Sequence, residues 1–299
     1  MDNLRDNKPE NFNLFVRGSK SRLGREIVKY FMLKNSSSTV VEISRFGGSF
    51  AYVINDISIA NVFFITNGKT TNTSSKQDCE FETQKLYQLL SDINVSQLLH
   101  PGDLIVFISS GGTVYGHGTE IKTESSALNP GTYYAHSKIL QERLVIDWAT
   151  SNGVKPLILR VANAYLLKNE KPGGLIELLL LACNGGDPVQ IRVDPTSRKQ
   201  YGLAIDYAKS FLEYIYSLNF TKFDQKFINI ASSQIYSVDE ILKIISKKYN
   251  TLENIPYIYN PKDILPLETV ILGSNFVSNH SNQDWTTLEK ALDQVPYTF

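Results

Sequence analysis

Residues 103–145 read DLIVFISSGGTVYGHGTEIKTESSALNPGTYYAHSKILQERLV, and this stretch decides the fold. It opens with an unbroken apolar run from Leu104 to Ile108, which is typical of a strand buried on both faces of a parallel sheet. Serines and glycines end the strand, a polar loop follows, and the next segment predicts a helix. Tyr134 and Lys138 stand four residues apart in that helix, so they share one of its faces.

The pair of Tyr134 and Lys138 points to acid–base chemistry. A lysine ammonium held near a phenol favours the phenolate form. A tyrosine in this setting can pass a proton to or from an alcohol or sugar oxygen near neutral pH. We therefore predict that Tyr134 and Lys138 are catalytic. Tyr30 and Lys34 repeat the spacing elsewhere in the chain, and for them we expect only a pair on a helix face.

The segments SSGGTVYG and NPGTYYAHSKILQERL resemble the extended short-chain dehydrogenases, the family of nucleotide-sugar epimerases, dehydratases and reductases. The residues that match the family pattern are Pro130, Tyr134, Ser137, Lys138 and Glu142. The resemblance implies an α/β fold, with a doubly wound parallel sheet of the Rossmann type and a smaller C-terminal mixed α/β lobe for the substrate. It also implies a nicotinamide cofactor, a nucleoside-diphosphate sugar as substrate, and a homodimer formed through the helix of Tyr134.

The catalytic hydroxyl of the family is displaced in this chain. The 4-epimerases and 4,6-dehydratases carry a serine or threonine three residues before Val-Tyr-Gly, and that position here is Gly111. Ser110 and Thr113 are the neighbouring hydroxyls, and either could hold the substrate oxygen. We favour Ser110 because it ends a strand; the alternative is a serine that bonds to its own backbone.

The first predicted strand is followed by the turn Gly18-Ser-Lys-Ser-Arg-Leu-Gly24 and then by a helix. In such a unit the pyrophosphate of a dinucleotide sits on the helix N-terminus. The family pattern has three glycines, and Ser21 replaces the middle one. The candidate cofactor residues of this turn are Gly18, Ser21, Leu23 and Gly24.

The end of the second strand bears on the choice of cofactor. It reads Ser44-Arg45, where an NAD site would have an acidic residue for the ribose hydroxyl. A guanidinium suits a 2′-phosphate, so the sequence favours NADP. The alternative is NAD, with Glu42 as the ribose ligand, since Glu42 and Ser44 share a strand face.

The remaining candidates rest on the resemblance. Asp56 corresponds to the residue that contacts adenine, and Asn67 follows a strand at a position beside the cofactor. Lys138, on its helix, is also a candidate cofactor-binding residue. Asn163 matches an asparagine near the substrate diphosphate, and Arg192 and Arg198 are further diphosphate candidates, or else solvated surface charges.

The hydrophobic pattern predicts strands at 14–16, 39–43, 62–65, 155–161, 189–192 and 227–230, and helices at 25–33, 80–93, 173–182 and 241–249. Ser237 and Glu240 form the pattern of a capping box before the last of these helices. We expect residues 12–165 to form the dinucleotide-binding domain, with further elements near 200–250 returning to it. Residues 166–299 then form mainly the substrate lobe.

Composition limits the partners of the chain. The 30 Lys and Arg balance the 30 Asp and Glu, which argues against nucleic acid or an anionic membrane. Cys79 and Cys183 lack metal-ligand spacing, so we expect reduced thiols and no metal. No stretch has the length and apolarity of a transmembrane helix, and the polar first residues predict a cytoplasmic protein.

The sequence therefore predicts a nucleotide-sugar oxidoreductase that moves a hydride at C4 of the hexose. Reduction of a 4-keto sugar is slightly favoured over 4-epimerisation. Two other classes stay open. The resembled family has a glycine at the position of Leu166 and an acidic residue at that of Gln200. These departures, with Ser21 and Gly111, suit a cofactor-binding sensor or scaffold without catalysis. A reductase of small carbonyl compounds would need no nucleotide.

Overall fold

The computed structural model of the chain describes residues 12–35, 40–43, 59–66, 68–168, 173–191, 194–220, 222–249, 257–259, 269–274 and 284–294. Its central feature is a six-stranded sheet with the strand order β10-β6-β4-β3-β1-β2. The strands are β1 (Asn13–Arg17), β2 (Val40–Ile43), β3 (Asn61–Ile65), β4 (Leu104–Ser110), β6 (Lys155–Val161) and β10 (Phe227–Ile230). Every neighbouring pair is parallel.

The direction of winding changes at β1, which pairs with β2 on one side and β3 on the other. Ligands of such sheets bind outside the carboxyl ends of the strands, at the place where the strand order reverses. Gly18 follows β1, and Gly68 lies shortly after β3. Both loops therefore lie at the point where the topology favours a ligand.

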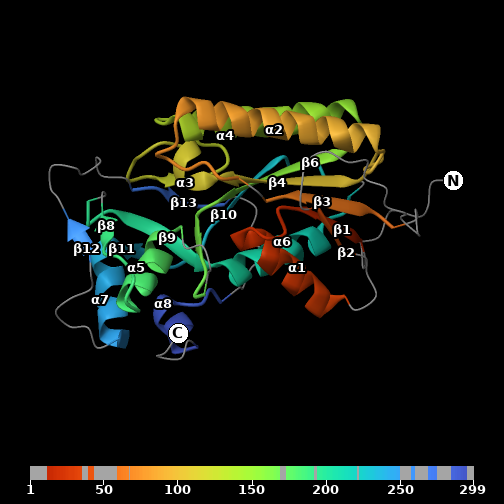
Figure 1. Cartoon of the computed structure of the whole chain (residues 1–299). Helices are drawn as coiled ribbons and strands as arrows, with labels where there is room; N and C mark the ends of the chain where they lie inside the picture. Colours follow the sequence, from red (N-terminus) through yellow and green to blue (C-terminus); the bar gives the residue numbers. More distant parts are fainter. Residues whose placement is uncertain are drawn as a thin grey trace.

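Helices cover both faces of the sheet (Figure 1). Helices α2 (Lys76–Val95) and α4 (Tyr133–Ser151) lie side by side on one face, and α1 (Arg22–Lys34) and α6 (Ala204–Ser217) lie on the other. The strands are apolar on both sides: Phe63 and Ile105 pack with α2 and α4, whereas Phe64 and Val106 pack with α1 and α6. This two-sided burial explains why the strands read as continuous apolar runs.

A smaller lobe lies beside the sheet. Strand β9 (Arg198–Leu203) pairs in parallel with β7 (Asn163–Tyr165) and antiparallel with β11 (Ile235–Ser237). Two parallel pairs accompany them, β8 (Val189–Ile191) with β12 (Tyr257–Tyr259) and β5 (Ile121–Lys122) with β13 (Ile271–Leu272). Helices α5 (Leu175–Cys183), α7 (Val238–Tyr249) and α8 (Leu288–Asp293) share its apolar core. The predicted fold class, a doubly wound sheet with a mixed lobe, is confirmed. Within the described ranges, no helix has the length and apolarity needed to cross a membrane.

Local capping explains where the observed elements differ from the sequence-based prediction. Helix α2 begins at Lys76, four residues before the predicted start, because Ser75 Oγ accepts a hydrogen bond from the amide of Asp78. The predicted capping box is confirmed: Ser237 N donates to Glu240 Oε2 at 2.7 Å, and Glu240 N donates to Ser237 Oγ at 3.1 Å.

A buried ion pair fixes α4 against the sheet. The guanidinium of Arg160, in β6, binds the carboxylate of Glu142, in α4, with an Nη2–Oε2 distance of 2.7 Å and an Nε–Oε1 distance of 3.1 Å. Ser109 Oγ donates to the same carboxylate at 2.6 Å. Arg160 Nη1 also donates to the Tyr115 hydroxyl, which in turn donates to Asn229 of β10. The network therefore connects α4 with three adjacent strands.

Removing one charge of this pair should destabilise the fold. In Glu142→Gln the side chain keeps its shape, but Arg160 becomes a buried cation without a counter-charge, and we expect unfolding to cost about 3–5 kcal/mol less. The control is Glu80→Gln in the pair Lys76–Glu80, whose side chains are 67% and 59% exposed. That change should cost under about 1 kcal/mol. Urea denaturation measures both, and equal small losses in the two variants would contradict the assigned role of the network.

Candidate active site

Tyr134 and Lys138 meet on the face of α4 that points toward β4. Thr132 caps the helix by accepting a hydrogen bond from the amide of Ala135. Tyr134 is half-buried in the first turn, and Lys138 is buried one turn later. The Lys138 ammonium lies 5.6 Å from the centre of the Tyr134 ring and 5.2 Å from that of Phe107 in β4. The structure thus brings the two predicted residues together beside the end of the strand.

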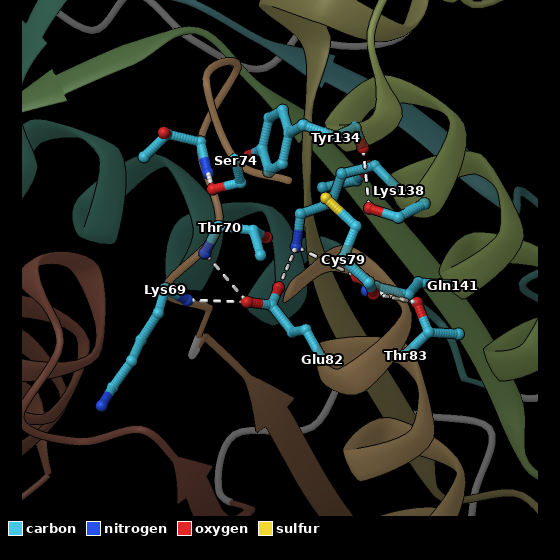
Figure 2. Close-up of polar contacts among 12 residues, drawn as sticks. Lys69, Thr70, Ser74, Cys79, Glu82, Thr83, Tyr134, Lys138 and Gln141 are labelled. Carbon is cyan, nitrogen blue, oxygen red and sulfur yellow. Dashed lines mark hydrogen bonds and ion pairs between the residues drawn. The ribbon is translucent and has the colours of Figure 1, made fainter. Parts of the chain in front are cut away.

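Two polar side chains hold Lys138 (Figure 2). Its Nζ lies 3.4 Å from Oε1 of Glu82, which comes from α2, and 3.1 Å from Oε1 of Gln141. Gln141 Nε2 in turn donates to Thr83 Oγ1 at 3.1 Å. Sequence reasoning missed Glu82 and Gln141, because only the packing of α2 against α4 brings residues 82 and 138 together.

Glu82 also binds the loop after β3. Its Oε2 accepts hydrogen bonds from the amides of Lys69 at 2.7 Å and Thr70 at 3.0 Å. Burial alone raises the pKa of Glu82, but Lys138 and the two amides outweigh burial, so the net pKa is lowered and the carboxylate is charged. A side chain at Gly68 would meet this pair, since a Cβ there would lie 2.8 Å from Glu82 Oε1.

The second Tyr-x-x-x-Lys pair has a different environment. It lies in α1, where the Tyr30 hydroxyl donates to Glu213 Oε1 at 2.7 Å and Lys34 Nζ lies 2.7 Å from the same oxygen. Burial and the hydrogen bond to Glu213 raise the pKa of Tyr30. The phenol proton is therefore held by a carboxylate, and the pair is the helix-face pair that the sequence predicts.

The candidate hydroxyls lie at the end of β4. Ser110 begins the short helix α3 (Gly111–Val114), but its side chain makes no capping hydrogen bond. Thr113 Oγ1 makes only a long contact of 3.5 Å with the carbonyl of Ser110. Ser109 is committed to Glu142. Ser110 and Thr113 are therefore the hydroxyls nearest to the family position that are not tied into the buried network.

The space beside Gly111 is filled by the lobe. A Cβ at Gly111 would lie 2.3 Å from Cδ1 of Leu272, in β13, and 3.1 Å from the carbonyl of Arg160. Leu272 is fixed by Gln200, whose amide donates to the Leu272 carbonyl at 3.0 Å and accepts from the Leu272 amide at 2.8 Å. Two departures from the family pattern, Gly111 and Gln200, are thus parts of one packing arrangement.

The turn for which we predict phosphate binding lies between β1 and α1. Gly18 has a φ of +89°, which favours glycine, and a Cβ at Gly24 would lie 2.2 Å from the carbonyl of Gly18. Ser21 caps α1 by accepting from the amide of Gly24 at 3.0 Å, and Leu23 packs against the core. The serine that breaks the glycine pattern therefore has a structural role of its own.

This turn fits a dinucleotide pyrophosphate. Ser19 Oγ is buried and has no hydrogen-bond partner among the described residues, so its hydroxyl could donate a hydrogen bond to an anionic oxygen. The N-terminus of α1 contributes backbone amides beside it. Glu42 is exposed in β2. Four predicted cofactor residues, Ser44, Arg45, Asp56 and Asn67, lie outside the described residues.

Of the three predicted substrate-binding residues, the structure describes Asn163 and Arg198. Asn163 is exposed in β7, and its Nδ2 donates to the carbonyl of Gln200 at 2.9 Å. Arg198 is half-exposed and pairs with Glu240 at 3.0 Å, so its guanidinium is engaged within the lobe. Arg192 lies outside the described residues.

An ion pair that sequence reasoning missed joins the turn to the lobe. Arg22, beside Ser21, lies 2.6 Å from Oε1 of the buried Glu177 in α5. It also donates to the carbonyl of Ala164, next to Asn163, at 3.2 Å. The same carboxylate accepts from the amides of Leu166 and Gly173. The start of α1 is therefore linked to the segment that carries Asn163.

Comparison with known proteins identifies relatives of the chain. Residues 83–231 match the model of the NAD dependent epimerase/dehydratase family. The dTDP-4-dehydro-6-deoxyglucose reductase of Escherichia coli is 29% identical over 148 residues, which are 49% of this chain and 46% of that protein. A putative UDP-glucose 4-epimerase of Methanocaldococcus jannaschii is 28% identical over 162 residues, 52% of this chain and 51% of that protein. The chain thus spans about half the length of these curated relatives.

The fold has solved counterparts over nearly its whole length. MoeE5, solved in complex with UDP-glucose and NAD, superposes with a TM-score of 0.75 at 18% identity, covering 94% of this chain and 96% of that one. At this identity the likeness is one of fold. The match over residues 83–231, about half of the chain, is what identifies this part of it as belonging to the NAD dependent epimerase/dehydratase family.

Proposed function

We propose that the chain catalyses hydride transfer at C4 of the hexose of a nucleoside-diphosphate sugar and works as a 4-keto-sugar reductase. The observation that carries the proposal is the position of Tyr134 and Lys138 on α4, beside the end of β4. The phosphate-binding turn after β1 lies at the carboxyl edge of the same sheet. A proton-transfer pair and a dinucleotide site on one edge are what such a reaction requires.

The residues divide the chemistry between them. A bound nicotinamide supplies the hydride that C4 of the keto sugar gains. The C4 oxygen gains the proton of the Tyr134 phenol, so the carbonyl becomes an alcohol and the phenolate recovers its proton from solvent. Lys138 stabilises the phenolate while it exists. Ser110, or Thr113 in its place, holds the oxygen during the transfer.

The second candidate function is 4-epimerisation, in which C4 loses and then regains a hydride while its oxygen loses and regains a proton, with no net redox change. The name of the M. jannaschii relative and the segment SSGGTVYG favour it. The name of the E. coli relative favours reduction. Ser44-Arg45 adds to that side, because a site for NADP suits a cofactor that is exchanged at each turnover.

The substrate should lie between the two parts of the chain. In this proposal residues 12–165 bind the cofactor, with elements near 200–250 returning to the sheet, and residues 166–299 contribute mainly the lobe for the nucleotide sugar. Asn163, Arg192 and Arg198 are its proposed diphosphate ligands. The link between Arg22 and Glu177 supports this arrangement, since it joins the cofactor turn to the lobe. A cytoplasmic location stays a prediction.

A second copy of the chain is the proposed partner of α2 and α4. Large apolar side chains stand exposed on these neighbouring helices: Phe81 at 56%, Tyr87 at 67%, Tyr133 at 59% and Leu140 at 50%. Burying them against the same surface of another copy would give a symmetric four-helix contact. Sedimentation analysis that finds only monomers at micromolar concentration would contradict the homodimer.

Loss of the Tyr134 hydroxyl should abolish proton transfer and leave the fold intact. We expect Tyr134→Phe to lower turnover by about 10²–10⁴-fold while cofactor affinity is unchanged. Tyr30→Phe is the matched control, because it removes a phenol from the same spacing in α1, and its turnover should equal that of the unmodified protein. A comparable loss in Ser110→Ala but not in Thr113→Val would assign the second hydroxyl. Full activity of Tyr134→Phe would refute the proposed role of Tyr134 and Lys138 in proton transfer.

The cofactor preference can be measured without a substrate. Charge-assisted contacts of Arg45 to one phosphate are worth about 1.5–3 kcal/mol, so NADPH should bind roughly ten- to a hundredfold more tightly than NADH. Arg45→Met should remove most of that difference. Calorimetric titration of both cofactors tests it, and tighter binding of NADH would assign the ribose to Glu42.

The direction of the reaction follows from stoichiometry. Purified protein should be assayed with NADPH against nucleoside-diphosphate hexoses and their 4-keto-6-deoxy derivatives. We expect one NADPH to be oxidised for each keto sugar consumed. Interconversion of C4 epimers without net change in nicotinamide absorbance would establish the epimerase instead. Cofactor binding without turnover of any sugar would favour the sensor or scaffold.

A further inference from the structure

The charge of Lys138 is balanced by the carboxylate of Glu82, which has no part in the proton transfer proposed for Tyr134 and Lys138. The side chains of Lys138 and Glu82 are 6% and 16% exposed, and their charged atoms lie 3.4 Å apart. The orientation of Glu82 is fixed, because its second oxygen holds the amides of Lys69 and Thr70. The pair is therefore a built part of the site and not a mobile surface contact (Figure 2).

The groups around Lys138 leave Glu82 as its anionic contact within the described part of the chain. From α2, Glu82 and the buried Cys79 face it, and burial raises the pKa of the Cys79 thiol, which is therefore neutral. From α4, Tyr134 and the uncharged Gln141 face it. Strand β4 contributes the ring of Phe107, and the loop after β3 contributes Gly68.

The other charged pair near α4 is self-contained. Glu142 binds Arg160 with both carboxylate oxygens, so its charge is already compensated beneath the helix. The net field at the Tyr134 phenol consequently depends on how far Glu82 offsets the ammonium of Lys138.

We propose that Glu82 is a positioning residue that fixes Lys138 and, through its charge, keeps Tyr134 a proton donor in the pH range where the protein works. The inference rests on the proposed function and deepens it. An ammonium alone favours the phenolate, which accepts protons and suits oxidation of an alcohol. An adjacent carboxylate offsets this effect and favours the phenol, which donates the proton that reduction of a carbonyl consumes. The pair thus biases the site toward reduction.

The two tyrosines of the repeated spacing illustrate how the position of a carboxylate matters. At Tyr30 the carboxylate of Glu213 binds the phenol directly and holds its proton. At Tyr134 the carboxylate binds the lysine instead, so the phenol stays available to a substrate. Glu82 can therefore tune the proton donor without blocking it.

The decisive variant removes only the charge. In Glu82→Gln the side-chain oxygen can still accept from the amides of Lys69 and Thr70, and the fold should be retained. In the pH profile for carbonyl reduction, the fall of kcat/KM at alkaline pH should move to lower pH by roughly one unit. The reason is that the charge of Lys138 is then no longer offset and favours the phenolate of Tyr134. Glu82→Asp should restore most of the profile. Glu80→Gln, an exposed change two residues earlier on α2, should leave it unaltered.

A second variant tests the opposite sign and does not depend on Glu82. Gln141→Glu places another carboxylate at the atom that lies 3.1 Å from Lys138 Nζ, so the alkaline limb should move to higher pH. A folded Glu82→Gln or Gln141→Glu protein with an unshifted profile would overturn the proposal.

A readout without turnover separates this inference from the proposed function. In protein labelled with ¹³C at the tyrosine ζ carbons, the signal that disappears in Tyr134→Phe is assigned to Tyr134. In the cofactor-free protein, the pH midpoint of that signal should fall in Glu82→Gln and rise in Gln141→Glu. These shifts would support the role of Glu82 even if no sugar were reduced. Unmoved midpoints would refute it even if the reductase activity were established.

Discussion

The geometry of the candidate site depends on the buried pair of Glu142 and Arg160. Helix α4 carries both members of the proposed proton-transfer pair, and this ion pair joins the helix to β6 while Ser109 joins it to β4. Arg160 is held in turn by Tyr115 and, through it, by Asn229 of β10. Because this buried charge pair needs all these hydrogen bonds, it fixes the position in which α4 packs against the sheet. The position of Tyr134 relative to the end of β4 is therefore set by groups that are buried beneath the helix.

The departures from the family pattern are compensated by neighbouring structure. The hydroxyl missing at Gly111 could not simply be restored, because Leu272 fills the space beside it. Gln200 stands where the family has an acidic residue, and its amide pairs with the backbone of Leu272 as another strand would. Ser21 replaces a glycine but caps α1. These substitutions are each matched by local packing or hydrogen bonds.

Much of this could be predicted because the signals are local. Apolar runs gave the strands, and short spacings gave the turn around Gly18 and the pair of Tyr134 and Lys138. The start of α2 was missed because one hydrogen bond, from the amide of Asp78 to Ser75 Oγ, decides it. Glu82 and Leu272 were missed for a deeper reason: each meets its partner across more than fifty residues of sequence, and no spacing rule encodes a contact made by the packing of helices or by a strand of the lobe.

In the proposed reaction, a cofactor at the carboxyl edge of the sheet faces C4 of a sugar whose oxygen Tyr134 protonates. Transfer of an isotope tests it most directly. A nucleoside-diphosphate 4-keto-6-deoxyhexose should be incubated with NADPH that carries deuterium at C4 of the nicotinamide, and the product examined by NMR. The account predicts deuterium at C4 of the sugar from one face of the nicotinamide only. Product without deuterium at C4, or deuterium at another carbon, would contradict it.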